Sequence, residues 1–175
     1  AISKMIKNSS GKTTQEEIRE LKKRTIALKT PPLPTISSSP PLALGIPIQF
    51  KLRPNKEGYE MLEFTFHEEG GIVTLTYGKE QGGYTSVLPF GYGHWKKGTR
   101  VRKPGIMIWT GGAKKTVTSA QWDGNFLNLE LRFYETAFAE YWNCSISNDG
   151  ITINREQNCG DHGEVALETL EGSVI

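Results

Sequence analysis

Apolar and polar residues alternate along one short run after another from Ile48 to Val174, and no segment between the runs has the 3.6-residue period of a helix. Residues 127–133 show the pattern plainly, with leucine or phenylalanine at every odd position and a polar residue at every even one. Counting such runs predicts roughly eight to ten strands at a spacing of about 10–12 residues. Because the edges of an antiparallel meander must be paired or covered, we predict an all-β domain that closes into an up-and-down barrel over residues 45–175.

Two turn sequences support this prediction. The alternating runs 61–67 and 73–77 are separated by Gly70 and Gly71, which indicates a hairpin. The Asn-Asp-Gly sequence at 148–150 is a stronger hairpin signal, because these residue types adopt the positive φ angles that tight hairpin turns require. A closed barrel of consecutive hairpins without intervening helices is lipocalin-like in architecture, and we favour it over a β-sandwich.

The first 44 residues differ in composition from residues 45–175, and we predict that they form a separate part of the chain. Residues 14–29 carry Ile18, Leu21 and Leu28 near helical spacing after threonines suited to an N-cap, which predicts an amphipathic helix. Six prolines and a run of three serines follow between residues 31 and 47. Prolines at this density exclude a regular helix or central strand. We therefore expect a helical arm and a Pro/Ser-rich linker at 1–44.

Charge and composition exclude several classes of function. The net charge is +2, and residues 1–34 alone carry eight Lys or Arg against three Glu, so the basic character belongs to the arm. The barrel sequence has one basic cluster, at 96–103, which is too small to predict a nucleic-acid partner. No apolar run approaches the ~20 residues of a spanning helix, so we expect no membrane span. Cys144 and Cys159 fit neither a disulfide framework nor a zinc signature.

Two strings resemble parts of serine-hydrolase active sites, but their context does not fit that chemistry. Residues 9–12 read Ser-x-x-Lys and residues 141–143 read Tyr-x-Asn. Gly11 interrupts the turn that would bring the serine and the lysine together, and alternation places Tyr141 and Asn143 on one face of a strand, away from Trp142. We therefore expect no catalytic residue in this chain.

The histidines do not predict a metal centre. His67, His94 and His162 have no partner at ligand spacing, so we expect neither a metal site nor a cofactor. His67 is interpreted as a solvated strand residue and His94 as a turn residue that makes a local hydrogen bond.

Candidate binding residues come from two aromatic segments, 88–95 and 131–136, with one tryptophan upstream of the second. The five candidates for ligand binding or domain docking are Trp95, Trp122, Arg132, Tyr134 and Glu135. One interpretation makes Arg132 part of a structural ion pair with Glu130 or Glu135 and assigns the aromatic rings to the core. The other interpretation places these groups around a pocket for a small molecule or a peptide.

The two faces of the run 127–133 distinguish these interpretations. If its leucines and phenylalanine face inward, the barrel is packed, and Arg132 and Tyr134 are external residues available for docking. If its polar face points inward, Arg132 would need Glu130 or Glu63 as a partner and would mark a cavity for an anionic ligand. The size of the aliphatic row favours the packed barrel.

Three segments of this chain together resemble a known family. They read LPFGYGHW at 88–95, SAQWDGNFLNLELRFYETAF at 119–138 and WNCSISNDGITINREQN at 142–158. The sequences of these segments and their order along the chain resemble those of the C-terminal lipocalin-like β domain of bacterial β-lactamase-related serine hydrolases. The arm and linker, EEIRELKKRTIALKTPPLP at 16–34, resemble the helix through which those proteins leave their catalytic domain.

The resemblance implies that the nucleophilic serine, its lysine and the tyrosine lie in an upstream catalytic domain of the same polypeptide. This chain, which does not begin with Met, would then be a piece of a longer protein and its non-catalytic accessory domain, which docks on the catalytic domain or shapes access to it. The resemblance also implies an extracytoplasmic location in a bacterium. The alternative function is a free-standing barrel that binds a small amphipathic ligand.

Overall fold

The computed structural model describes residues 15–20, 31–34, 43–102, 112–160 and 163–175. The chain divides into two compact units, Ala1–Pro31 and Pro32–Ile175. In the first unit residues 15–20 are helical, whereas the rest of the helix predicted at 14–29 and the Ser-x-x-Lys string lie outside the described residues. Among the described residues, none belongs to a helix with the length and apolar character needed to cross a membrane.

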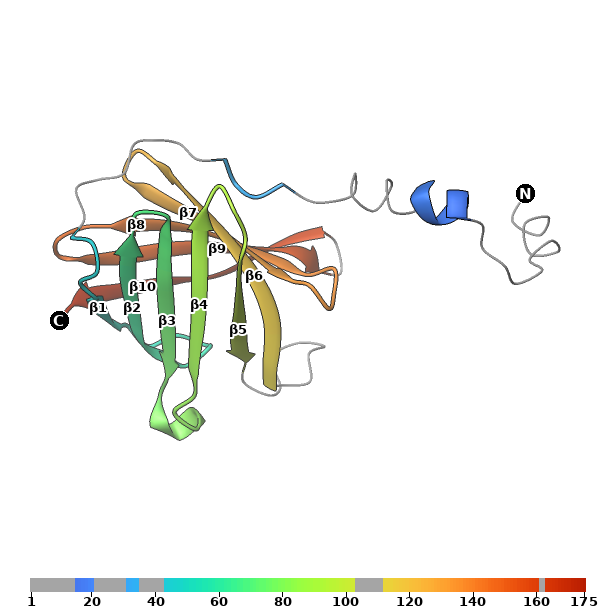
Figure 1. The fold of residues 1–175 in the computed structure, drawn as a ribbon. Coiled ribbons are helices and arrows are strands. Elements are labelled where there is room, and N and C mark those ends of the chain that lie inside the picture. The colour runs from blue at the N-terminus through green and yellow to red at the C-terminus, as the bar shows by residue number, and fades with distance from the viewer. Residues whose placement is uncertain (1–14, 21–30, 35–42, 103–111, 161–162) are drawn as a thin grey trace. The chain divides into compact units, whose positions relative to one another are not determined.

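The second unit is a closed β-barrel of ten strands (Figure 1). The strands are β1 (Ile48–Leu52), β2 (Tyr59–His67), β3 (Gly70–Tyr77), β4 (Thr85–Tyr92), β5 (Lys96–Arg102), β6 (Gly112–Asp123), β7 (Phe126–Phe133), β8 (Ala139–Ile146), β9 (Gly150–Gly160) and β10 (Gly163–Val174), with a short 3-10 helix, η2 (Lys79–Gln81), between β3 and β4. Each strand pairs antiparallel with the next, and β1 closes the barrel against β10. The prediction of an antiparallel up-and-down barrel is confirmed.

Both predicted hairpins form. His67 pairs with Gly70 across the β2–β3 turn, and Ile146 pairs with Ile151 across the β8–β9 turn. Gly70 has a φ of 150°, and a Cβ atom at this position would lie 2.0 Å from the carbonyl oxygen of Phe90 in β4. Only glycine permits this conformation and this close approach of β3 to β4.

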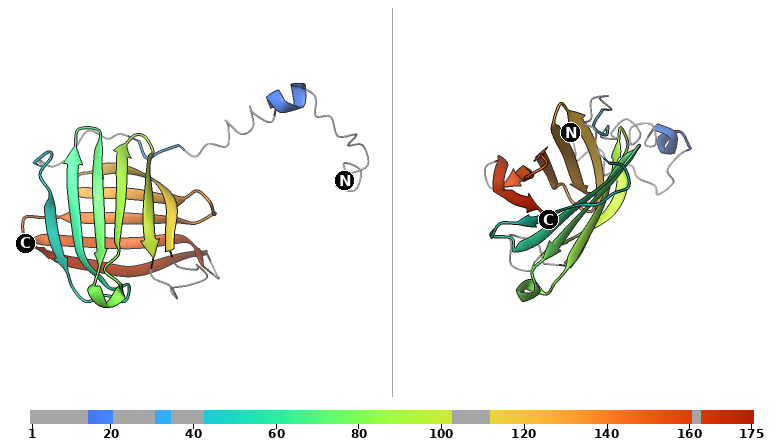
Figure 2. Two further views of the ribbon diagram at one scale, coloured as in Figure 1. Left: turned by 60° about the horizontal axis from the view of Figure 1, so that its bottom comes forward. Right: turned by 90° about the vertical axis from the view of Figure 1, so that its left-hand side faces the viewer.

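The core fills the space between two crossing groups of strands, with β2–β4 in one layer and β7–β10 in the other (Figure 2). Leu127, Leu129 and Leu131 of β7 are fully or almost fully buried, and they contribute to one continuous hydrophobic cluster. Phe64, Phe66 and Phe90 contact one another within this cluster. The Leu/Phe face of β7 therefore faces inward, as the size of the aliphatic row predicted.

Arg100 does not belong to a surface patch, although the sequence groups it with the basic residues at 96–103. Its side chain is completely buried inside the barrel. The physical reason is strand alternation, which turns Arg100 inward while its neighbour Thr99 stays exposed. The basic cluster on the barrel surface is correspondingly smaller than its sequence suggests.

Candidate functional site

Two of the five predicted site residues lie together on the outer surface. Arg132 projects from the outer face of β7, and its guanidinium carbon lies 6.0 Å from the centre of the Trp95 ring. The Nε of Arg132 also donates a hydrogen bond to Oε1 of Glu130 at 2.6 Å. Arg132 therefore forms the ion pair with Glu130, one of the two partners that the sequence allowed.

The other three candidates have different surroundings. Trp122 lies inside the barrel, 3% exposed, and its Nε1 donates to the hydroxyl of Tyr92 at 3.0 Å. Tyr134 lies in the β7–β8 turn and is 50% exposed. Glu135 binds Lys115 at 2.9 Å, and this hydrogen bond raises the pKa of Lys115 above its ordinary value. The structure does not bring Trp122 together with Arg132 and Tyr134, because Trp122 is on the inward face of β6.

A buried charge cluster, which the sequence interpretation missed, occupies one end of the barrel. It consists of Glu57, Arg100, Glu140 and Arg155. Nη2 of Arg100 lies 3.3 Å from Oε2 of Glu140 and 3.7 Å from Oε2 of Glu57. Nη1 of Arg155 lies 2.7 Å from Oε1 of Glu57. Two cations and two carboxylates therefore balance one another in the interior.

Aromatic residues surround Arg100, whose Nε and Nη1 are buried without a hydrogen-bond partner among the described residues. The hydroxyl of Tyr59 accepts a hydrogen bond from Nη2 of Arg100 at 2.9 Å and another from Tyr77 at 3.2 Å. The ring of Trp142 lies 5.0 Å from the guanidinium carbon, and its indole N–H donates to Glu140 at 3.1 Å. Such contacts stabilise a desolvated cation through the negative face of the ring.

The protonation states follow from this geometry. Burial opposes the charge of Arg100, but the carboxylates of Glu140 and Glu57 outweigh it, so the pKa of Arg100 is raised above its ordinary value. Burial raises the pKa of Tyr59 well above its ordinary value, against the opposing effect of Arg100. Arg100 is therefore always charged, and Tyr59 is a neutral donor and acceptor.

Strand alternation is the signal that would have placed two members of this cluster, Glu140 and Arg155, in the interior. Glu140 has the same parity as Trp142 and Cys144 of β8, and Arg155 has the same parity as Ile153 of β9. A charged residue in phase with an apolar row belongs to the interior.

The outer surface of β7–β10 carries a groove of about 500 Å³, called here the outer groove. Its walls include Leu33, Asn128, Glu130, Tyr141, Asn143, Asn154, Glu156, Ala166, Leu167 and Thr169. The backbone N–H of Leu33 donates to Oγ of Ser119 in β6 at 3.1 Å. This hydrogen bond holds Leu33, which lies between two prolines, against the outer face of the barrel.

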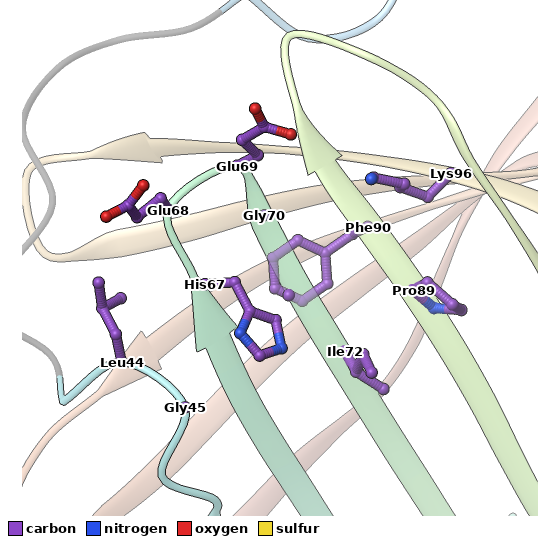
Figure 3. A pocket seen from close by; sticks show the side chains of 11 residues that line it. Leu44, Gly45, His67, Glu68, Glu69, Gly70, Ile72, Pro89, Phe90 and Lys96 are labelled. Atoms are coloured by element: carbon purple, nitrogen blue, oxygen red, sulfur yellow. The ribbon is translucent and has the colours of Figure 1, made fainter.

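A second groove, of about 690 Å³, lies beside the β2–β3 turn (Figure 3). The side chains of His67, Glu68, Glu69 and Lys96 surround it, with Ile72 and Pro89 at one side. His67 is exposed, as predicted, and Nδ1 of His94 lies 3.0 Å from the carbonyl oxygen of Tyr92, which is the predicted local contact. Among the described residues no group of three or more His, Cys, Asp or Glu side chains is placed to hold a metal ion.

Comparisons with protein-family models, with curated proteins and with solved structures found no match to this chain. The evidence on function is therefore the geometry described above and the sequence itself.

Proposed function

We propose that this chain is a non-catalytic accessory domain that docks through its outer face on the catalytic domain of a β-lactamase-related serine hydrolase, carried upstream on the same polypeptide. The observation that carries the proposal is the filled interior. Apolar side chains occupy most of the barrel, and the buried charge cluster is internally neutralised. Groups available to a partner therefore lie outside, where Arg132, Trp95 and Tyr134 are found.

The attachment of Leu33 supports docking through this face. Because Leu33 is bound to Ser119 on the outer face of β6, the polypeptide that would lead to an upstream domain leaves the barrel from this face. Tethering raises the effective concentration of the two domains and permits a modest interface to form. Arg132 and Trp95 supply a cationic and an aromatic group, which are enriched among residues that dominate binding energy.

The identity of the partner rests on the sequence resemblance at 88–95, 119–138 and 142–158. The same resemblance leads us to propose an extracytoplasmic location in a bacterium. The alternative function, an amphipathic ligand inside the barrel, has less support because the interior is occupied by side chains.

The test begins with the reading frame upstream of Ala1. The proposal predicts that it encodes a domain with Ser-x-x-Lys and Tyr-x-Asn strings, and that this domain, expressed separately, binds the 175-residue chain in calorimetry. Tyr134→Ala and Arg132→Ala should each weaken binding by about fivefold or more, as expected for interface residues that contribute about 1 kcal/mol. Tyr84→Ala is the matched control, since Tyr84 is 51% exposed in a different loop. An upstream frame without these strings, or equal binding by all variants, would overturn the proposal.

A further inference from the structure

The outer groove contains a row of amide side chains that crosses three strands. Asn128 of β7 lies opposite Asn143 of β8, which lies opposite Asn154 of β9. Side chains at paired positions of neighbouring antiparallel strands share one face and lie about 5 Å apart. All three line the groove. The row therefore presents amide groups at regular intervals across the outer face.

Some of the hydrogen-bonding groups in this row are used within the protein. Nδ2 of Asn143 donates to Oδ1 of Asn128 at 2.7 Å, and the hydroxyl of Thr169 donates to Oδ1 of Asn154 at 3.2 Å. Among the described residues, the amide N–H groups of Asn128 and Asn154 and the carbonyl oxygen of Asn143 have no partner. The groove thus offers donors and an acceptor in one row.

A second row runs beside the first. Tyr141 of β8 is half-buried and lies between Glu130 of β7 and Glu156 of β9 in the register. Glu130 is paired with Arg132, whereas Glu156 is exposed and has no cationic partner within the described part of the chain. The groove therefore has an excess negative charge at Glu156 and an aromatic residue between its two glutamates.

We propose that the outer groove binds an oligosaccharide whose sugars are uncharged or carry an amino group. Each sugar hydroxyl both donates and accepts a hydrogen bond, and an amide side chain supplies the complementary pair of groups. The apolar C–H face of a sugar ring matches the ring of Tyr141, since aromatic side chains combine apolar surface with a polar end. Glu156 disfavours anionic ligands and favours an amino group.

A peptide is less well matched to this surface. Extended peptides commonly bind by pairing with a free strand edge, and β7, β8 and β9 are paired on both sides in the closed barrel. The lining of this groove combines apolar residues, such as Leu33 and Leu167, with the three asparagines, and the regular spacing of those amide groups matches the hydroxyls of a sugar chain better than the alternating side chains of a peptide. The inference does not depend on the proposed docking function.

The test is a chemical-shift titration of the 175-residue chain with tetrasaccharides of glucose, N-acetylglucosamine, glucosamine and galacturonic acid. We expect saturable shifts at Tyr141, Asn143 and Asn154 with at least one of the first three sugars and none with the acidic one. Asn143→Ala and Tyr141→Ala should each weaken binding by about tenfold, because each removes a contact to the sugar. Asn148→Ala is the control, because it makes the same deletion in the exposed β8–β9 turn.

The amide NMR spectrum of each variant, compared with that of the unmodified chain, shows whether the variant is folded. The proposal is overturned if none of the three uncharged or amino sugars gives saturable shifts up to about 10 mM, a range that includes weak recognition. It is also overturned if both groove variants bind as well as the unmodified chain, or if galacturonic acid binds most tightly. Stronger binding by a Pro-Pro-Leu-Pro peptide at the same residues would assign the groove to polypeptide instead.

Discussion

Arg100 is held as a cation in the barrel interior by Glu140 and Glu57, and the stability of the fold depends on this balance. Arg100→Met removes the cation 3.3 Å from the buried carboxylate of Glu140, whereas Glu57 keeps Arg155 at 2.7 Å, so we expect the free energy of unfolding to fall by about 3–5 kcal/mol. Urea denaturation measures this loss. The double variant Arg100→Met, Glu140→Leu should recover part of the lost stability, because it also removes the buried carboxylate of Glu140.

Arg53→Met is the matched control for this experiment. Arg53 also pairs with a glutamate, Glu171, but its side chain is exposed. Exposed ion pairs contribute about 1 kcal/mol or less. An equal loss of stability in the two arginine variants would show that the interior pairing of Arg100 has no special role.

Cys144 makes stability depend on pH in the alkaline range. Burial raises the pKa of its thiol above the ordinary value of 9.0, so the folded protein keeps the thiol neutral while the unfolded chain ionises. The stabilising contribution is therefore complete below pH 9 and declines as the pH rises above it. Between pH 8 and pH 10 the decline attributable to Cys144 should be about 1.4 kcal/mol.

The free energy of unfolding of the unmodified chain and of Cys144→Ala is measured by urea denaturation at both pH values, and the two proteins are compared. Subtraction removes the contributions of the ionisable groups that both proteins share. The account of Cys144 fails if the variant loses stability as steeply as the unmodified chain.

At the scale of the elements, Gly70 determines how β3 begins between β2 and β4. Gly70→Ala would place a Cβ atom 2.0 Å from the carbonyl oxygen of Phe90, so the strands must separate. We expect a loss of more than about 3 kcal/mol in the free energy of unfolding. Gly124→Ala should cost only about 1 kcal/mol, because Gly124 has a φ of +58° but no atom within 4 Å of the added group. Similar losses in the two variants would contradict the steric explanation.

The strands were predictable because local residues determine them. Gly70 and the turn at 148–150 mark the positions at which two hairpins turn. The inward face of β7 follows from its four apolar residues at alternate positions. The buried charge cluster was not predicted, since its members come from strands far apart in the sequence and their pairing depends on barrel closure. Arg100 shows the difficulty, because Gly98 and Arg102, the residues two positions away on the same strand face, do not form an apolar row that would indicate burial.

The candidate site was predictable only in part, for the same reason. The pairing of Arg132 with Glu130 follows from their two-residue separation on one strand face. The contact of Arg132 with Trp95 requires β5, β6 and β7 to lie side by side, and the sequence of any one strand does not specify this arrangement. The amide row of the outer groove likewise depends on the register of three strands.

At the scale of the whole molecule, the closed barrel has a filled interior, and we propose that it acts through its outer surface. Side chains from both layers meet in the core, and Trp122 of β6 and Trp142 of β8 are both buried in it. Core side chains without exposed surface line this interior, in contrast to barrels that enclose a ligand cavity.

The most direct test is a titration of the 175-residue chain with laurate, an amphipathic probe, followed by tryptophan fluorescence and by the methyl resonances of Val73, Leu129 and Leu131. These three residues are buried in the core. The account predicts no saturable change in either signal below the concentration at which the probe forms micelles. Saturable binding of one equivalent, with shifts of these interior methyl groups, would contradict the filled interior and favour the small-ligand function.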